Sequence, residues 1–321
     1  MGFSYLRLRS GLGPNHYTSS DTRSGPNSSV GRDEFGRRCV SELVDTDSYH
    51  LKASTNMNQS AQTHTDGLVG TRTIKNTKAI VTGAGRGFGR AVAAALSAAG
   101  AHVIGVARTG AQLDEVAGEL GDSFTPVAAD AADPATPGRL MEEYRPRTLV
   151  LCAGAAPRMS SLPDQTWESF SQNWNVDVAQ AFHWTRCALR LPLRPGSSVI
   201  AMSSGAAVNG SPLSGGYAGA KATVRFITSY AAIESQRAGL GIRFVSVLPR
   251  LTPATDLGAK AVAAYAERQG VDVETFVQSM GSMGPVLNTE QVGKSILQIA
   301  TGDPQDAGAY LLASSGLSAL A

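Results

Sequence analysis

The chain has 321 residues, of which 42% are hydrophobic and 17% are charged, and its formal net charge at pH 7 is +2. A near-neutral balance without a basic stripe argues against nucleic acid as a partner. No run approaches the roughly 18 apolar residues that a membrane span needs. Cys39, Cys152 and Cys187 are odd in number and have no paired spacing, so they predict neither a disulfide framework nor a metal site. We expect a soluble, cytoplasmic globular protein.

The composition changes near residue 73. Residues 1–72 are rich in Ser, Thr, Gly and Asn and show no sustained hydrophobic period, so they bury too little apolar surface to offset the entropy of ordering. Met57 is the only methionine between Met1 and the first glycine-rich motif. We therefore expect residues 1–72 to be a disordered or non-native extension, with 1–56 disordered or not translated. Residues 73–321 are expected to form one domain.

Seven short apolar runs predict strands within this domain, and helical patterns fill most of the gaps, including 166–191 and 216–238. Strands that alternate with helices indicate parallel pairing with right-handed crossovers. The expected fold is α/β: a single doubly wound, Rossmann-type domain with a mainly parallel seven-stranded sheet and helices on both faces. Its ligand crevice would lie outside the carboxyl ends of the strands. The strand candidates are 78–82, 102–106, 124–128, 148–152, 198–203, 242–248 and 309–313.

The first strand leads into a glycine-rich turn, Thr82-Gly83-Ala84-Gly85-Arg86-Gly87-Phe88-Gly89, and then into an Ala-rich helix. Glycine permits the tight turn and lets a phosphate approach the main chain, while the helix N-terminus offers free N–H groups and a partial positive charge. The strand before the turn and the helix after it favour a dinucleotide cradle over a plain loop. The candidate cofactor-binding residues in it are Gly83, Gly85, Arg86, Gly87, Phe88 and Gly89.

A second constellation lies downstream. Tyr217 and Lys221 are four residues apart, so on a helix they share one face. Ser204 follows the apolar run at 198–203, which reads as a buried strand. A phenol, an ammonium and a hydroxyl could there meet one reacting oxygen. The alternative is an ordinary surface Tyr and Lys on an amphipathic helix, and the nucleotide motif upstream argues against it.

With both elements in this order, the chain resembles the short-chain dehydrogenase/reductase family of the classical type over roughly residues 73 to 321. Thr82-Gly83-x-x-x-Gly87-x-Gly89 fits that family's glycine pattern, and Ser204, Tyr217 and Lys221 fall at its catalytic spacing. The resemblance implies further cofactor contacts after the third, fourth and sixth strands. These would come from Asp130, Ala153, Gly154, Pro249 and Thr252.

The chain also departs from the family pattern. Asp177 stands where the family has a helix Asn, whose main-chain carbonyl is thought to hold a relay water, so we keep Asp177 among the candidate catalytic residues. Leu151-Cys152 replaces the usual Asn-Asn before Ala153-Gly154, and Pro249-Arg250 replaces Pro-Gly. None of these departures removes a catalytic side chain.

The end of the second strand bears on the choice of cofactor. An Asp or Glu there commonly accepts from the ribose 2′-OH of NAD, whereas this chain has Ala107 at that position, followed by Arg108. With Arg86 in the glycine turn, two cations and no carboxylate suit a 2′-phosphate. NADP is therefore expected, and NAD is less favoured.

The resemblance implies an NAD(P)-dependent oxidoreductase that interconverts a ketone or aldehyde and an alcohol by hydride transfer. Tyr217 would act as acid/base, because a neighbouring ammonium favours its phenolate. Ser204 would fix the reacting oxygen and Lys221 would hold the ribose hydroxyls. The expected partners are a small-molecule carbonyl or alcohol and further copies of the chain, in a homodimer or homotetramer. Two alternatives stay open: an NADP-binding regulatory protein without turnover, and an isomerase or lyase of the same broad family.

The segment 252–285 interrupts the last crossover with extra helical patterns at 259–268 and 273–280. It is expected to cover the crevice as a substrate lid. Met280 and Met283 could line the pocket, and plain core filling is the alternative.

Overall fold

The computed structural model describes residues 73–282, 284–302 and 308–320. The predicted extension, residues 1–72, lies outside the described residues, and so does Met283. These described residues form one compact unit.

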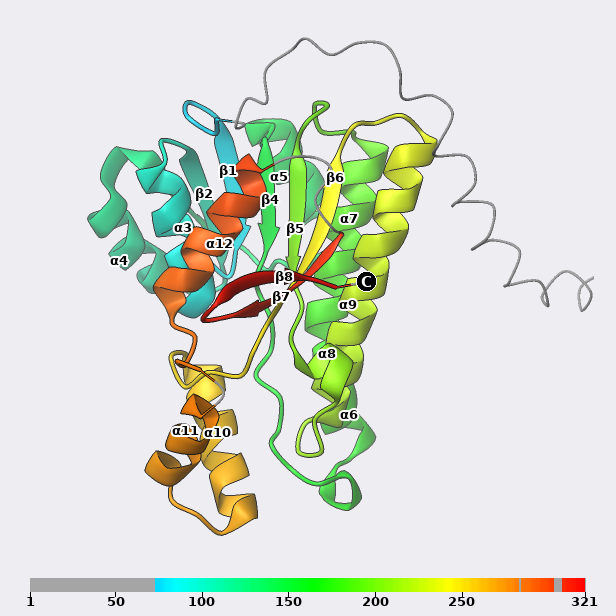
Figure 1. The fold of residues 1–321 in the computed structure, drawn as a ribbon. Helices are drawn as coiled ribbons and strands as arrows, with labels where there is room; N and C mark the ends of the chain where they lie inside the picture. Colours follow the sequence, from blue (N-terminus) through cyan, green and yellow to red (C-terminus); the bar gives the residue numbers. More distant parts are fainter. Residues whose placement is uncertain (1–72, 283, 303–307, 321) are drawn as a thin grey trace, which may run out of the picture. The chain divides into compact units, whose positions relative to one another are not determined.

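A mainly parallel sheet forms the centre of this unit (Figure 1). Its strands stand in the order β3-β2-β1-β4-β5-β6-β7-β8, so the order switches between β1 and β4, where a ligand crevice is expected. Each of the seven runs predicted as strands forms one. The five runs in the middle of the sheet are almost fully buried, as parallel strands covered on both faces are. The bounds are β1 (Lys78–Thr82), β2 (His102–Ala107), β3 (Phe124–Ala128), β4 (Thr148–Leu151), β5 (Ser198–Met202), β6 (Arg243–Pro249) and β7 (Ala309–Ala313).

The sheet has eight strands rather than the predicted seven. The additional strand, β8 (Gly316–Ala319), turns back and pairs antiparallel with β7. Gly316 has a φ of 108°, a conformation that L side chains rarely adopt, so the glycine permits this reversal. β8 has only 4 residues, and two of them are exposed, so its sequence contains no apolar run that predicts a strand.

Helices cover both faces of the sheet (Figure 1). On one face α3, α4 and α12 pack over a core that includes Val92 and Ile296. On the other face α5, α7 and α9 pack around Leu140, Trp184 and Val224. None of the helices in the described part of the chain is long and apolar enough to span a bilayer. The bounds are α3 (Gly87–Ala98), α4 (Gly110–Leu120), α5 (Thr136–Tyr144), α7 (Ala179–Arg190), α9 (Gly215–Arg237) and α12 (Thr289–Thr301), with short helices η1 (Gly121–Ser123), η2 (Leu162–Asp164) and α8 (Ala206–Asn209).

The helical pattern over 166–191 is not one regular helix. It consists of α6 (Trp167–Asn173), a π-helical turn η3 (Trp174–Val178) and α7. π-helical turns inside α-helices occur frequently at functional sites, and this one carries Asp177.

Two helices, α10 (Asp256–Gln269) and α11 (Val273–Gly281), form a hairpin beyond the carboxyl end of the sheet (Figure 1). They coincide with the extra helices predicted in the segment 252–285. The hairpin has a small core of its own around Val262 and Phe276, and the Tyr265 ring stacks on the Phe276 ring at 6.4 Å. We refer to α10 and α11 together as the lid hairpin.

Candidate active site

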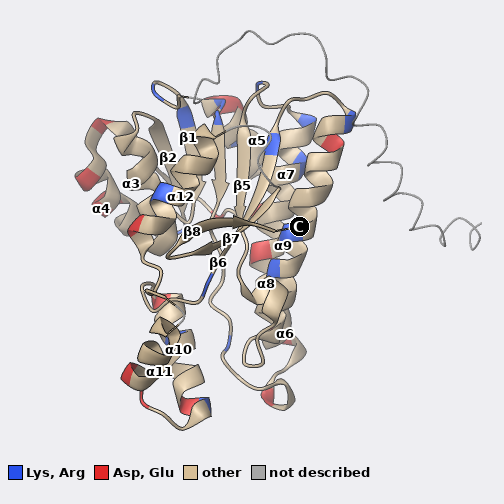
Figure 2. Ribbon diagram, viewed as in Figure 1, with Lys and Arg blue, Asp and Glu red and all other residues tan. Residues whose placement is uncertain are grey.

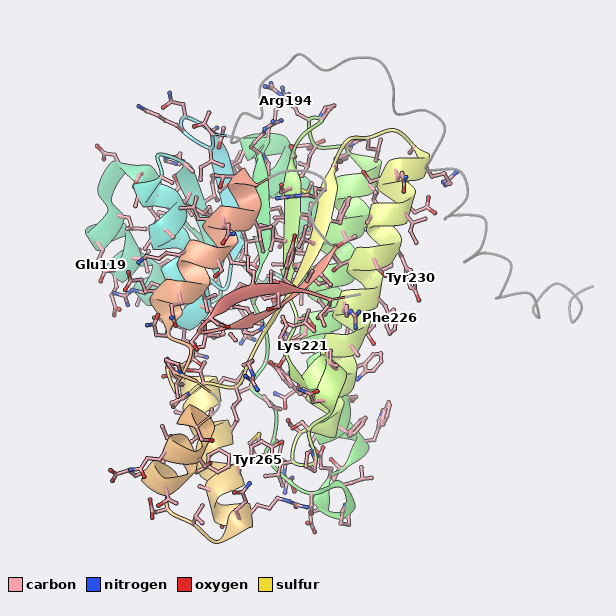
Figure 3. All side chains as sticks on the ribbon, in the orientation of Figure 1. Glu119, Arg194, Lys221, Phe226, Tyr230 and Tyr265 are labelled. Carbon is pink, nitrogen blue, oxygen red and sulfur yellow. The ribbon has the colours of Figure 1, made fainter. Side chains whose placement is uncertain are left out.

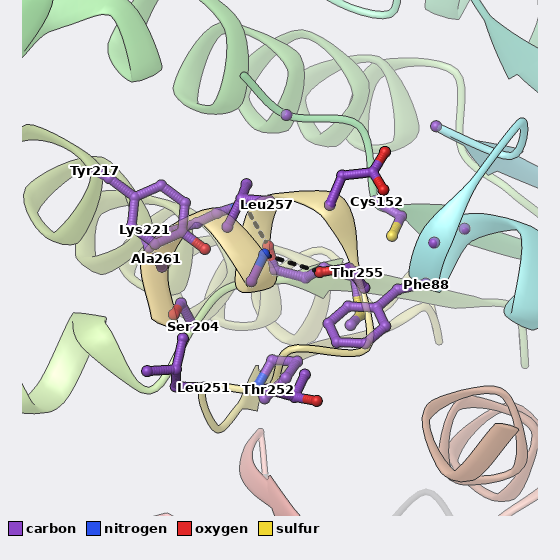
Figure 4. Close-up of a pocket in the computed structure, with 18 of the residues that line it drawn as sticks. Phe88, Cys152, Ser204, Tyr217, Lys221, Leu251, Thr252, Thr255, Leu257 and Ala261 are labelled. Carbon is purple, nitrogen blue, oxygen red and sulfur yellow. Dashed lines mark hydrogen bonds between the residues drawn. The ribbon is translucent and has the colours of Figure 1, made fainter. Parts of the chain in front are cut away.

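One cavity of about 980 Å³ opens at the carboxyl ends of β1, β4, β5 and β6. It brings together every residue that the sequence singles out for catalysis or cofactor binding. Figure 4 shows Tyr217, Lys221 and Ser204 toward one end of the pocket and Phe88 and Cys152 toward the other. The predicted site residues that line the cavity are Gly83, Gly85, Arg86, Gly87, Phe88, Gly89, Arg108, Asp130, Ala153, Gly154, Asp177, Ser204, Tyr217, Lys221, Pro249 and Thr252.

The glycine turn leaves the N-terminus of α3 open. Gly83 and Gly87 have φ values of 68° and 54°, which favour glycine. A Cβ on Gly89 would lie 2.0 Å from the Gly83 carbonyl oxygen, so only glycine lets the helix pack this close to the turn. The Arg86 side chain does not cap the helix, and helix N-termini of this kind bind phosphate. These residues fit the pyrophosphate of a dinucleotide.

A buried hydrogen-bond network ties the ends of β1 and β4 to α7. The Thr82 hydroxyl accepts from the Cys152 amide at 2.9 Å and donates to the Gln180 Oε1 at 2.5 Å. Gln180 Nε2 in turn donates to the Ala153 carbonyl at 2.7 Å. Sequence reasoning did not select Gln180, a polar residue on the buried face of the amphipathic helix α7.

Tyr217 and Lys221 lie one turn apart on α9, with the Lys221 Nζ 5.6 Å from the centroid of the Tyr217 ring. Ser204 follows β5, and its Oγ accepts from the Ala206 amide at 3.2 Å. The neighbouring Ser203 is buried and donates to the Lys221 carbonyl at 2.7 Å, which fastens the end of β5 to α9. The phenol, the ammonium and the Ser204 hydroxyl therefore share one wall of the cavity.

Asp177 and Lys221 form a buried ion pair. Their Oδ1 and Nζ atoms are 2.9 Å apart, and the two side chains are 1% and 8% exposed. Lys221 Nζ also donates to the Met202 carbonyl at 3.0 Å. The pair links the π-helical turn, the end of β5 and α9.

The second oxygen of the Asp177 carboxylate is also fixed. Oδ2 accepts from the Ala155 amide at 3.0 Å and from the Asn173 Nδ2 at 3.2 Å. Asn173 donates to the Ala155 carbonyl at 2.7 Å as well. The other oxygen, Oδ1, faces the Lys221 ammonium. Sequence reasoning missed Asn173, although it lies four residues before Asp177 and so shares a helix face with it; its contact with the Ala155 carbonyl arises only in the fold.

These charges determine how the buried groups titrate. Burial opposes the charged form of Lys221, but the Asp177 carboxylate and then Tyr217 outweigh it and raise the pKa of Lys221 above its usual value. Lys221 is therefore an ammonium throughout the neutral range. Burial also raises the pKa of the Cys152 thiol to about 11, and the Lys221 charge opposes this rise only in part.

The predicted 2′-phosphate end of the cavity is exposed. Arg108 follows β2 and is exposed, and Asp130 accepts from the Ala132 amide at 2.9 Å. The Arg86 guanidinium pairs with the carboxylate of Asp256, the first residue of α10, at 2.9 Å. Arg86 therefore joins the glycine turn to the lid hairpin.

The chain matches known proteins over most of this domain. Residues 77–266 match the family profile described as short chain dehydrogenase, which is more than half of the chain. Over 217 residues the chain is 28% identical to carbonyl reductase (NADPH) 2 of Sus scrofa, covering 63% of this chain and 86% of that protein. Over 159 residues it is 30% identical to an L-xylulose reductase of Mesocricetus auratus, covering 49% of this chain and 65% of that protein.

Two solved structures share the fold. The 3-ketoacyl-(acyl-carrier-protein) reductase from Brucella melitensis complexed with NADH has a TM-score of 0.62 at 24% identity, covering 74% of this chain and 96% of that chain. The NAD+-bound xylitol dehydrogenase has a TM-score of 0.65 at 18% identity, covering 74% and 97%. Such identities establish the fold alone. The family match confirms the resemblance predicted from the sequence, and the two structures confirm the predicted fold class. The chain therefore belongs to the short-chain dehydrogenase family, a family of oxidoreductases with a Rossmann-type α/β fold.

Proposed function

We propose that the protein is an NADP-dependent oxidoreductase that interconverts a ketone or aldehyde and an alcohol, with Tyr217 as its acid/base. The observation that carries this proposal is that Ser204, Tyr217 and Lys221 lie on the wall of the same cavity as the open N-terminus of α3. A regulatory protein without turnover has no need of this hydroxyl, phenol and ammonium beside the cradle.

When bound, the nicotinamide supplies or accepts the hydride. Tyr217 gives its phenolic proton to the carbonyl oxygen in the reducing direction and takes it back from the alcohol in the other. The Ser204 hydroxyl donates to the same oxygen and fixes its position. Lys221 remains charged beside the phenol and would hold the ribose hydroxyls of the bound nucleotide. Asp177 acts through Lys221 as a positioning residue, because its carboxylate is fixed on both oxygens.

The preference for NADP is supported by the charges at the exposed end of the cavity. Arg86 and Arg108 both line it, and Ala107 leaves the end of β2 without a carboxylate. Guanidinium groups bind phosphate with paired, charge-assisted hydrogen bonds. The name of the Sus scrofa relative includes NADPH, which agrees with this preference.

The phenolic hydroxyl of Tyr217 is the sharpest test. Tyr217→Phe should lower the turnover of a reducible carbonyl by about 10²–10⁴-fold, because it removes only the proton donor. Binding of NADPH, measured by its fluorescence, should persist. Tyr144→Phe on α5 is the matched control, since Tyr144 does not line the cavity. A Tyr217→Phe protein with native turnover would remove the proposal.

We also propose a homodimer formed through α9. Phe226, Tyr230 and Ile233 recur at helical spacing on this helix and are 55%, 60% and 60% exposed. Figure 3 shows Phe226 and Tyr230 projecting outward from α9. A two-fold dimer would bury this apolar stripe against the same stripe of a second copy. Light scattering should give twice the monomer mass for the native protein and less for Phe226→Lys; a native monomer would exclude this dimer.

A further inference from the structure

The lid hairpin presents an apolar face to the cavity. Leu257, Ala261 and Tyr265 recur every four residues on α10, so they share one face of the helix, and all three line the cavity. Phe276 and Met280 do the same on α11. The hairpin therefore contributes aliphatic and aromatic surface to the pocket.

The charged residues of the hairpin lie elsewhere. Lys260, Glu267, Arg268 and Glu274 are all exposed, and none of these four lines the cavity. Figure 2 shows both signs of charge along the hairpin. Asp256 does line the cavity, but its carboxylate is paired with Arg86. The charges thus follow the solvent side of the hairpin, while its cavity side is apolar.

The hydroxyl groups at this wall are already paired with one another. The Ser211 Oγ lies 2.5 Å from the Tyr265 hydroxyl and 2.6 Å from the Ser214 Oγ. Ser214 is the residue before α9, so this contact sets α10 beside the start of the helix that carries Tyr217. These contacts place the apolar face of α10 near the wall that carries Tyr217. Because the Tyr265 hydroxyl is paired with Ser211, Tyr265 offers its ring to the cavity rather than a free hydroxyl.

Apolar residues continue on other segments that line the same cavity. Met159 lies in the loop after β4, and Leu251 follows β6. Figure 4 draws Leu251, Leu257 and Ala261 together with Ser204 and Tyr217. The exposed Arg250 also lines the cavity.

We infer that the substrate is an apolar ketone or aldehyde whose alkyl or aromatic body packs against the lid hairpin. This inference rests on the proposed function and names its substrate class. An apolar body gains from burial in proportion to the surface that leaves water. A polyol would instead place hydroxyl groups against Leu257, Ala261 and Met280, where they lose their hydrogen bonds to water without replacement.

A series of straight-chain 2-ketones, from butanone to nonanone, tests the inference with NADPH as reductant. We expect kcat/KM to rise roughly fourfold for each added methylene until the cavity is filled. L-Xylulose, the compound in the name of one relative, and a short keto acid should both be reduced less efficiently than the longer ketones. A preference for L-xylulose or the keto acid, or a flat ketone series, would overturn the inference.

Variants of the hairpin locate the effect. Met280→Gln and Leu257→Gln should flatten the ketone series, because each replaces apolar surface in the cavity by an amide. Val273→Gln on α11 is the control, since Val273 is exposed and does not line the cavity. Equal slopes in Met280→Gln, Leu257→Gln and the native protein would show that the apolar body does not bind here.

The outcomes separate this inference from the proposed function. A native protein that binds NADPH by fluorescence titration but reduces none of these carbonyls would contradict the proposed function itself. Turnover that depends on Tyr217 but favours the polar compounds would contradict only the substrate class.

Discussion

The Asp177 carboxylate lies 2.9 Å from the Lys221 ammonium in the interior of the domain. The family resemblance implies a neutral Asn at this position, so this chain adds a negative charge beside the lysine that neighbours Tyr217 on α9. Tyr217 and Lys221 on α9, Asp177 on the π-helical turn and Cys152 after β4 are the titratable groups that act on one another here.

Asp177→Asn should lower the stability of the domain. Lys221 is buried, and the Asp177 carboxylate is the largest of the causes that raise its pKa. Removal of one partner of a buried ion pair typically costs about 3–5 kcal/mol in the free energy of unfolding, because the other charge stays buried without compensation. Urea denaturation at neutral pH measures the loss, and Asp122→Asn, on the short η1 helix, is the control. An unchanged unfolding midpoint would show that Asp177 does not compensate the Lys221 charge.

Arg108→Ala should weaken NADPH far more than NADH. A charge-assisted contact with the 2′-phosphate is typically worth about 1.5–3 kcal/mol, so the dissociation constant for NADPH should rise roughly 10- to 100-fold. NADH has no phosphate to lose. Titration of both nucleotides by fluorescence measures the difference, with Arg139→Ala on α5 as the control. Equal weakening of both nucleotides would argue for NAD.

Gly154→Ala should destabilise the fold. A Cβ at this position would lie 2.8 Å from the Asp177 Oδ1, so the buried carboxylate would have to move. Overpacking of this kind typically costs about 1–3 kcal/mol in the free energy of unfolding. Urea denaturation measures it, and a smaller loss in an Asp177→Ala background would trace the effect to this contact. Gly118→Ala on α4, where a Cβ meets nothing within 4 Å, is the control.

Cys152 should react slowly with alkylating reagents despite lining the cavity. Burial raises its pKa from 9.0 to about 11, so the reactive thiolate at pH 8 should be about a hundredfold scarcer than in an unperturbed thiol. The rate of iodoacetamide labelling, followed by peptide mass spectrometry, should rise about tenfold per pH unit between 8 and 10. Rapid labelling of Cys152 at pH 7 would contradict this.

The strands and the two motifs could be predicted because their signals are local. The apolar composition of runs such as 78–82 and 198–203 is enough to predict buried strands, and the glycine turn depends on adjacent residues. The pairing of Asp177 with Lys221 could not be predicted in this way. It depends on the packing of the π-helical turn η3 against α9, and a regular helical pattern does not indicate that turn.

Other features of the fold and the site could not be predicted from the sequence either. Gln180 and Asn173 act through backbone groups of the loop after β4, which only the folded sheet brings near. β8 is too short and too exposed to show an apolar run. The ion pair of Arg86 with Asp256 joins residues 170 positions apart in the chain.

That exposed ion pair has a consequence for the order of events in turnover. A 2′-phosphate bound at Arg86 would compete with Asp256 for the guanidinium and so release the first turn of α10. An exposed ion pair of this kind opens at little cost. We therefore expect NADPH to enter before the carbonyl compound, whereas NADH leaves the pair closed. Product-inhibition patterns measure this order. The same patterns in Asp256→Asn as in the native protein would show that α10 moves independently of the nucleotide.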